Sequence, residues 1–352
     1  MQVLVCSFAK INVGLCIGPK RADGFHELRT LYQTIGLHDV IRMSVGPGSG
    51  IAIRCKDSRV PTAETNTCYR ILERATAALG VKCRVSLEIE KQLPVRGGLG
   101  GASTNAVASL LALERVLKKQ LPGPEKLRIA SEVGSDLPLF LLGGTVLGVG
   151  RGEDVFPLPD LAATPCVLAI PDVGVSTPQA FADWDEIATQ EGHKLTPTPT
   201  KPSRTPNRNA CQSKPSKLTV VSPSVRMNEF SRRLSAWLSG LPGKLGKPVT
   251  GVPAGDRDRA ESPLLDLVRT GIENDFERVV FPKHPELRKV KRALEDGGAF
   301  YASLSGSGSA LYGLFRTREA AAKAVERLRK KGIPAQATVT LTRQQYWRKI
   351  FG

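Results

Sequence analysis

The sequence predicts a two-domain α+β protein, and three observations support that prediction. The chain has 352 residues, which is enough for two ordinary domains, and 41% of them are hydrophobic, which is enough to form cores. Strand and helix patterns are mixed over roughly the first 150 residues. From about residue 160 a second series follows in the order strand, strand, helix, strand, which is typical of an α+β sandwich.

The first domain is expected to begin with strands. Residues 1–15 indicate a buried strand, because they lack the basic segment, the apolar segment and the cleavage site of a signal peptide. Apolar and polar residues alternate in 51–55 and in 85–91. Alternation of this kind is typical of a strand with one buried face.

Three helices are predicted in the same domain. The first covers 69–79, with Asn66 or Thr65 as its N-cap. The second follows a glycine-rich stretch and carries an apolar stripe through 107–117. The third covers 124–133 and stops at a glycine.

The second domain is expected to contain four strands and a helix. A buried strand is predicted at 166–170, and two more at 299–304 and 310–315 flank a glycine loop. An amphipathic helix follows within 317–332, with a threonine as its cap and a glycine beyond its end. Residues 335–342 supply the last strand.

The domain limits follow from these patterns. We place the first domain at 1–158, the second at 159–342 and a C-terminal tail at 343–352. The second domain is interrupted near 193–224 by a stretch rich in Pro, Thr, Ser and Lys that lacks apolar periodicity. Such a stretch cannot bury enough surface to offset its chain entropy. We expect a disordered basic insertion there, with a phosphorylated or anion-binding tether as the alternative.

Composition and charge exclude several classes of function. The formal net charge is +17, concentrated in part between 191 and 261, but no RNP, zinc-finger or KH-type pattern accompanies it. Nucleic acid is therefore not the expected partner, and a basic surface or small anionic molecules are favoured. No run of about 18 apolar residues occurs, so no membrane partner is expected. The seven cysteines form no C-x-x-C pair, which predicts reduced thiols in a cytoplasmic protein.

A glycine-rich stretch raises the question of chemistry. It reads LPVRGGLGGASTNA at 93–106 and runs directly into an apolar helix pattern. Glycines let backbone N–H groups approach an anion, and the first turn of a helix has unpaired N–H groups with a partial positive charge. The stretch therefore predicts a phosphate cradle. It matches neither the Walker A loop nor G-x-G-x-x-G, and a glycine turn packed against a sheet is the alternative.

Four other stretches contain residues that could serve in catalysis or binding. They are Lys10 with Asn12 on one face of the first strand, Phe25 with His26 after an Asp-Gly turn, Asp136 after a helix stop, and a glycine-serine loop at Gly306, Ser307 and Gly308. Taken alone, each has an ordinary alternative: a surface lysine, core aromatics, a turn aspartate or a tight hairpin. Their order along the chain is more specific than any one of them.

Together these motifs resemble the GHMP kinase superfamily. The order A-K-I-N, A-D-G-F-H-E-L, P-x-x-x-G-L-G-G-A-S-T-N-A, D-L-P-L-F, G-R-G-E and G-S-G-S carries the resemblance, over 1–184 and 262–342. It is closest to members that phosphorylate the 2-hydroxyl of a cytidine-diphosphate sugar alcohol in non-mevalonate isoprenoid synthesis. The resemblance implies a ribosomal-protein-S5-like first domain, a ferredoxin-like second domain, and an ATP-dependent kinase that uses Mg²⁺ in a cleft between them.

The resemblance implies roles for two catalytic residues. Asp136 would be the general base that accepts the proton of the substrate hydroxyl. Lys10 would lie beside it, keep it ionised and stabilise charge as the phosphoryl group moves. This division suits phosphoryl transfer, which depends mostly on positioning and on charge stabilisation.

The resemblance also implies an ATP site and a substrate site. The ATP phosphates would lie on Pro94, Val95, Arg96, Gly97, Gly98, Leu99, Gly100, Gly101, Ala102, Ser103, Thr104 and Asn105. Ser103 is the candidate ligand for magnesium. Relative to the usual pattern, Ala102 replaces a common glycine and Thr104 a common serine.

The substrate side of the site follows in the same way. His26 would hydrogen-bond the cytosine edge, while Phe25, which stands in place of the usual Tyr, and Phe181 would stack on its ring. Arg151 would face the substrate diphosphate. The remaining implied substrate contacts are Asn12, Thr177, Gly306, Ser307 and Gly308.

Three rival functions are compatible with the same residues. Another superfamily kinase, for homoserine or mevalonate, is disfavoured because A-D-G-F-H-E-L suits recognition of a base. A nucleic-acid-binding protein would have to use the basic insertion. A catalytically dead relative is disfavoured by the presence of Lys10 and Asp136. The expected molecule is a monomer or a homodimer whose partner is a small-molecule substrate.

Overall fold

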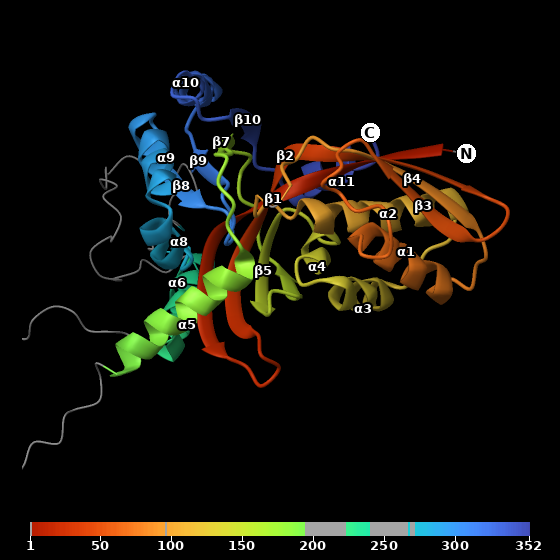
Figure 1. The fold of residues 1–352 in the computed structure, drawn as a ribbon, viewed down its shortest axis with the longest axis horizontal. Helices are drawn as coiled ribbons and strands as arrows, with labels where there is room; N and C mark the ends of the chain where they lie inside the picture. Colours follow the sequence, from red (N-terminus) through yellow and green to blue (C-terminus); the bar gives the residue numbers. More distant parts are fainter. Residues whose placement is uncertain (1, 96, 194–222, 240–266, 268–271) are drawn as a thin grey trace, which may run out of the picture.

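The computed structural model describes residues 2–95, 97–193, 223–239, 267 and 272–352. The basic insertion expected near 193–224 therefore lies almost entirely outside the described residues. The elements below belong to the described ranges. They form two sheets with helices packed against them, which is the predicted α+β class (Figure 1).

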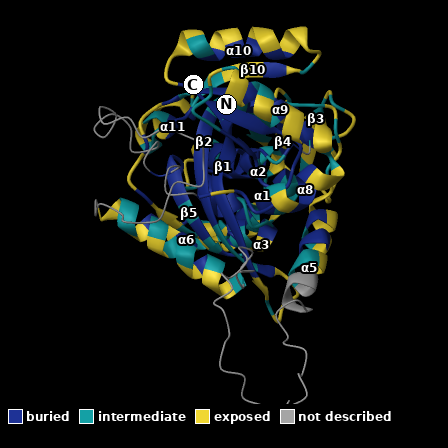
Figure 2. Cartoon of the chain, turned by 90° about the vertical axis from the view of Figure 1, so that its left-hand side faces the viewer, coloured by how far each residue is buried: buried dark blue, intermediate teal, exposed yellow. Residues whose placement is uncertain are grey.

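The first sheet contains six strands in the order β3-β4-β2-β5-β6, with β1 paired to β2. The strands are β1 (Gln2–Lys20), β2 (His26–Gly46), β3 (Gly50–Cys55), β4 (Arg84–Glu90), β5 (Thr145–Gly150) and β6 (Asp154–Pro157). β4 alternates buried and exposed residues along its length, as its sequence predicts. β1 and β2 form one long antiparallel hairpin. This hairpin runs through the middle of the molecule, where its residues are largely buried (Figure 2).

Helices cover one face of the first sheet. They are α1 (Thr67–Ala78), α2 (Gly101–Leu117), α3 (Gly123–Val133) and the short α4 (Leu137–Phe140). Asn66 caps α1 by accepting a hydrogen bond from the Cys68 amide, which confirms one of the two predicted caps. α2 is buried from Thr104 to Glu114, because it lies between the sheet and α1. The apolar side chains of these helices and of the sheet form one core.

The second sheet has the order β10-β7-β9-β8. Its strands are β7 (Pro165–Ala169), β8 (Tyr301–Leu304), β9 (Leu311–Leu314) and β10 (Ala335–Val339), and its helices are α8 (Glu277–Lys283), α9 (Pro285–Asp296) and α10 (Arg318–Lys330). Thr317 caps α10 by accepting from the Ala320 amide, as predicted. Two strands, a helix and a strand follow one another as the sequence indicates.

The two sheets share a core. Ile11 and Leu31 of the long hairpin pack in one buried cluster with Leu168 and Leu314 of the second sheet. Two further helices, α5 (Thr177–His193) and α6 (Pro223–Leu238), also belong to the described structure, and α6 packs along β1. Because β1 and β2 contact both halves, residues on this hairpin can meet loops from either domain.

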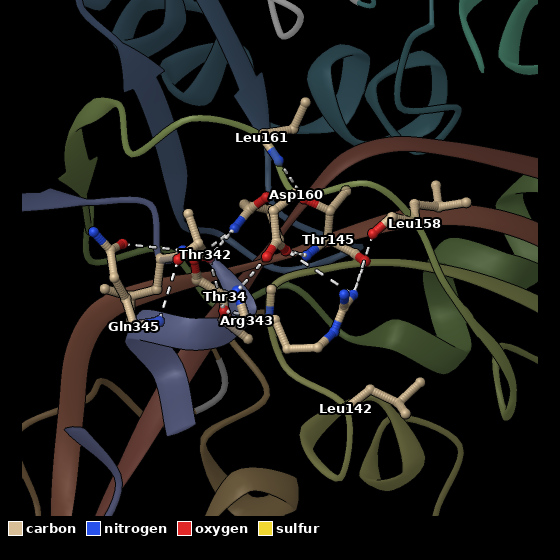
Figure 3. A network of polar contacts seen from close by, with 12 residues as sticks. Thr34, Leu142, Thr145, Leu158, Asp160, Leu161, Thr342, Arg343 and Gln345 are labelled. Carbon is tan, nitrogen blue, oxygen red and sulfur yellow. Dashed lines mark hydrogen bonds and ion pairs between the residues drawn. The ribbon is translucent and has the colours of Figure 1, made fainter. Parts of the chain in front are cut away.

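The segment 343–352, expected as a C-terminal tail, forms the helix α11 (Arg343–Lys349). Tyr346 is buried in the first core and donates a hydrogen bond to the Phe140 carbonyl at 2.7 Å. Arg343 joins a polar network in which its backbone N–H donates to Asp160 and its guanidinium donates to the Thr145 carbonyl (Figure 3). These contacts tie the end of the chain to Phe140 and Thr145 of the first domain and to Asp160 at the start of the second.

Candidate active site

Lys10 lies at the centre of a buried polar cluster on β1. Its amine is 3.3 Å from the Asp136 carboxylate and donates to the side-chain carbonyl of Asn12 at 2.7 Å. Asn12 in turn donates to the Thr30 hydroxyl at 2.8 Å. Lys10 is only 4% exposed, so the surface-lysine alternative is wrong. A buried ammonium needs a paired charge, and Asp136 supplies it.

Asp136 has a second partner that the sequence analysis missed. It directly precedes α4, and the Tyr32 hydroxyl donates to its Oδ1 at 3.1 Å while Lys10 approaches Oδ2. Burial, reinforced by the Asp136 charge, raises the pKa of Tyr32 well above its ordinary value. The phenol therefore stays a neutral donor. Two donors fix the orientation of this carboxylate, which a general base requires.

Tyr32 occupies a slot that two glycines leave open. A Cβ added at Gly148 would lie 2.6 Å from its ring, and one added at Gly152 would lie 2.5 Å from its hydroxyl. Gly152 also has a φ of +101°, which favours glycine. This explains the second glycine of G-R-G-E. The sequence contained that glycine, but only the pairing of β2 with β5 shows which side chain needs the space.

The glycine-rich stretch forms the start of α2 beside Lys10. Gly100 is the N-cap with a φ of +70°, and the Lys10 amide donates to the Leu99 carbonyl at 3.0 Å. A Cβ at Gly100 would lie 2.8 Å from the Phe140 ring and 3.2 Å from the Lys10 side chain. The close approach of this loop to β1 therefore depends on glycine. It places the first-turn N–H groups of α2 next to the Lys10–Asp136 ion pair.

A pocket of about 310 Å³ opens at this helix start. The glycine-rich stretch forms one side of it, from Pro94 to Ser103 among the described residues, together with Asn105. The other lining residues were not found by the sequence analysis and are Arg59, Val60, Pro61, Thr65, Asn66, Thr67, Cys68, Ile89 and Lys91. A cavity with apolar walls, backbone amides and a few polar groups fits a nucleotide.

Lys91 brings a positive charge to the pocket. Its amine is 2.5 Å from the carboxylate of Asp39, which is fully buried. A Cβ at Gly101 would lie 3.4 Å from that amine, so Lys91 stands beside the first turn of α2. A cation and a helix N-terminus together attract phosphate. Lys91 lies two residues before the glycine-rich stretch. A positive charge so close to a predicted phosphate site was the signal from which the sequence could have identified it.

The predicted cradle residues do not all face the pocket. Arg96 lies outside the described residues. Thr104 is 1% exposed, and the Asn105 amide donates to Asp39 at 2.9 Å and accepts from the Ser7 hydroxyl. Thr104 is therefore buried and does not line the pocket, whereas Asn105 lines it with its amide already bonded to Asp39 and Ser7. Ser103 is half-buried, lies in the first turn of α2 and lines the pocket.

The second glycine loop interlocks with the first. The Ser305 hydroxyl donates to the Gly98 carbonyl at 3.0 Å, and the Ala310 amide donates to the Gly97 carbonyl at 3.3 Å. A Cβ at Gly306 would lie 3.7 Å from the Lys10 amine. The loop is a hairpin between β8 and β9, but its position against Lys10 adds it to the site. Asn274 holds it by donating to the Gly306 carbonyl at 2.8 Å.

Two of the predicted substrate residues meet at this loop. The Thr177 hydroxyl, at the start of α5, lies 2.7 Å from the Ser307 hydroxyl. Ser307 is 7% exposed. The first turn of α5 and the second glycine loop are therefore joined directly. This contact places the start of α5 against the loop that approaches the Lys10 amine.

The predicted base-binding residues gather at the ends of β1 and β2. His26 is 6% exposed and stacks on Phe181 of α5, with ring centroids 5.0 Å apart. Phe25 is 53% exposed, and the Arg151 guanidinium lies 5.0 Å above its ring. Arg151 is itself paired with Glu153 at 2.8 Å. Burial acts to raise the pKa of Glu153, but hydrogen bonds from Arg151 outweigh this effect and the pKa is lowered. The pair is therefore ionic.

Comparison with known proteins agrees with this geometry. Residues 66–144 match the model described as GHMP kinases N terminal domain, and 258–334 match GHMP kinases C terminal. A 4-diphosphocytidyl-2-C-methyl-D-erythritol kinase of Solibacter usitatus (strain Ellin6076) is 36% identical over 323 residues, which are 92% of this chain and 84% of that protein. The chain belongs to the 4-diphosphocytidyl-2-C-methyl-D-erythritol kinase family.

Other members of this family give the same result. The enzyme of that name from Chlorobium luteolum (strain DSM 273 / BCRC 81028 / 2530) is 31% identical over 93% of this chain and 94% of its own. A crystal structure of a 4-(cytidine 5'-diphospho)-2C-methyl-D-erythritol kinase is 28% identical, with a TM-score of 0.64 over 96% of this chain and 98% of that one. The family and the two-domain GHMP kinase fold predicted from the sequence are therefore confirmed.

Two features are absent from the described part of the chain. No helix there combines the length and the apolar character needed to cross a bilayer. No group of three or more His, Cys, Asp or Glu side chains there has the arrangement of a metal site.

Proposed function

We propose that this protein transfers the γ-phosphate of ATP to the 2-hydroxyl of 4-diphosphocytidyl-2-C-methyl-D-erythritol, in the non-mevalonate route to isoprenoid precursors. The main support for this proposal is the Lys10–Asp136 pair. The Lys10 amine lies 3.3 Å from the Asp136 carboxylate, beside the start of α2. The names of the relatives supply the substrate. The pair supplies a base and a fixed cation, and the helix start supplies a place for phosphate.

The pocket at the start of α2 fits ATP. The nucleoside would lie among the residues at 59–61 and 65–68, and the phosphates would extend over Gly98, Gly100 and Gly101 toward Lys10. Glycine at these positions leaves room for a phosphate where a Cβ would intrude. This orientation points the terminal phosphate at the catalytic pair.

The residues present also fit a magnesium ion carried by ATP. Magnesium keeps waters and phosphate oxygens and needs only one or two protein ligands. The Ser103 hydroxyl is the proposed ligand, because Ser103 lines the pocket in the first turn of α2. When bound, the ion would neutralise charge on the polyphosphate.

The chain's own residues would then manage the proton and the developing charge. Asp136 accepts the proton of the substrate hydroxyl as the oxygen bonds to phosphorus. Lys10 keeps that carboxylate ionised and stabilises charge on the transferred group. Tyr32, which donates to the other carboxylate oxygen, limits the directions in which Asp136 can accept. Each role is a positioning or electrostatic one, as phosphoryl transfer requires.

The ends of β1 and β2 would bind the cytidine. His26 would hydrogen-bond the base edge, and Phe25 and Phe181 would stack on its ring. Phe25 retains a stacking surface and lacks the hydroxyl of the usual tyrosine. Arg151 would reach the substrate diphosphate by exchanging its contact with Glu153. Asn12, Thr177 and the loop at 306–308 would complete the substrate side.

We also propose the cytoplasm as its compartment, because the cysteines of the described ranges are free thiols. Domain limits at 158/159 and 342/343 are proposed from the change of sheet between β6 and β7 and from the last strand of the second sheet.

Phosphate transfer from ATP tests the function directly. Purified full-length protein is given ATP, Mg²⁺ and the cytidine-diphosphate methylerythritol, and the phosphorylated product is measured. Homoserine and mevalonate serve as competing substrates. We expect turnover of the cytidine substrate alone. Preferential phosphorylation of homoserine or mevalonate would refute the proposed function in favour of another GHMP kinase activity.

A further inference from the structure

A carboxylate of α5 lies against the proposed base-reading histidine. The Asp185 Oδ1 is 2.7 Å from the His26 Nε2, and the Lys20 amine is 3.3 Å from the other oxygen of the same carboxylate. The three residues come from the end of β1, the start of β2 and α5, which lies beside these strand ends (Figure 1). Because an ionised carboxylate only accepts hydrogen bonds, the proton between His26 and Asp185 is on Nε2.

The same helix also holds the face of the imidazole. Phe181 is four residues before Asp185 and therefore on the same side of α5. Its ring stacks on His26 with an interplanar angle of 10°. One helix face thus restrains both the plane of the imidazole and its Nε2 edge. His26 is 6% exposed, so its orientation is strongly constrained.

The other ring nitrogen is left as an acceptor. Neutral imidazole has one N–H donor and one lone pair, so a proton on Nε2 places the lone pair on Nδ1. Across the described ranges, Asp185 is the hydrogen-bond partner of the His26 ring, and Nδ1 has none. An acceptor without a protein partner, on a ring that is otherwise mostly buried, is available to a ligand that donates to it.

We propose that Asp185 is a specificity-determining positioning residue, which fixes His26 as an acceptor and thereby selects cytosine over uracil. The inference rests on the proposed function, since it assumes that His26 meets the base edge. Cytosine presents its N4 amine as a donor, whereas uracil presents a carbonyl oxygen at the equivalent position. A uracil carbonyl would face the Nδ1 lone pair. Moving the proton to Nδ1 would leave the Nε2 lone pair 2.7 Å from a carboxylate oxygen.

The protonation of His26 can be measured without any substrate. The chain contains only four histidines, at 26, 38, 193 and 284, so ¹⁵N-histidine labelling of the full-length protein gives a simple spectrum. The signals that are present in the spectrum of the parental protein and missing from that of His26→Gln belong to His26. We expect a neutral imidazole with its proton on Nε2. A dominant Nδ1–H form, or a dominant imidazolium, would overturn the proposal.

Asp185→Asn tests the consequence for specificity. The amide has nearly the same shape but can either accept from Nε2 or donate to it, so the Nδ1–H form is no longer opposed. We expect kcat/KM for the uridine-diphosphate analogue to rise and the cytidine-to-uridine ratio of kcat/KM to fall by about tenfold or more, with KM for ATP unchanged. General damage to the site would lower kcat/KM for both substrates together. An unchanged ratio would therefore refute the proposal.

Lys20→Gln is the matched control. It removes the Lys20 contact with the other Asp185 oxygen, and the Lys20 side chain is 58% exposed. We expect the control to keep the parental ratio. An equal change in the control would overturn the proposal, since local charge and not the tautomer would then set the ratio. If the cytidine substrate is not phosphorylated at all, the proposed function fails, while the histidine spectrum still decides the tautomer.

Discussion

Gly98→Ala tests the contact between the two glycine loops. Gly98 has a φ of +76°, and an added Cβ would lie 2.1 Å from the Ser305 carbonyl oxygen. Ordinary contacts at that atom begin near 3.4 Å, so the loops would have to separate by more than ~1 Å. That movement would break the Ser305–Gly98 hydrogen bond, which is 3.0 Å long.

The loss of stability caused by the clash at Gly98 can be separated from the cost of the backbone conformation. A positive φ costs any non-glycine residue about 1–2 kcal/mol. Gly80→Ala has the same cost, since Gly80 has a φ of +61°, but no atom lies within 4 Å of its added Cβ. Overpacking costs about 1–3 kcal/mol, and a lost hydrogen bond about 1 kcal/mol. We expect Gly98→Ala to lower the free energy of unfolding by roughly 2–4 kcal/mol more than Gly80→Ala.

Two assays check this prediction. Urea unfolding of both variants gives the difference in free energy. Steady-state kinetics give kcat/KM for ATP, which we expect to fall by about 100-fold in Gly98→Ala, because the proposed phosphate cradle would move relative to Lys10. Gly80→Ala should keep the parental kinetics. Equal stability and equal kinetics in the two variants would show that the loops do not interlock as described.

Three further predictions concern the carboxylate proposed as the base and the buried phenols. Asp136→Asn should retain ATP binding and lose ~10²–10⁴-fold in kcat, and near-normal turnover would exclude Asp136 as the base. Tyr32→Phe keeps the ring in its slot but removes the hydrogen bond to Asp136, so kcat should fall by about tenfold with little change in either KM; an unchanged kcat would contradict the role given to Tyr32. Burial raises the pKa of Tyr32, Tyr312 and Tyr346 above the ordinary 10.0, so the unfolded chain loses these protons first. The free energy of unfolding should therefore be unaffected below about pH 10 and fall above it by about 1.4 kcal/mol per pH unit for each tyrosine, and urea unfolding that stays constant up to about pH 11 would refute this.

Local pattern in the sequence determined the elements and much of the site. Period-two alternation predicted β4, and capping residues located the starts of α1 and α10, because both signals act within a few residues. Lys10 and Asn12 are two residues apart, and this spacing placed them on one face of β1. The order of the motifs indicated the family, which the comparisons confirm.

Tertiary structure decided which distant residues meet. Tyr32 reaches Asp136 only because β2 pairs with β5 and the glycines of β5 and of the turn after it leave a slot. Lys91 reaches the pocket because buried Asp39 holds it, and Asp185 reaches His26 because α5 packs beside the ends of β1 and β2. No local pattern contains these contacts. They depend on strand register and helix packing, which arise from the burial of apolar surface across the whole chain.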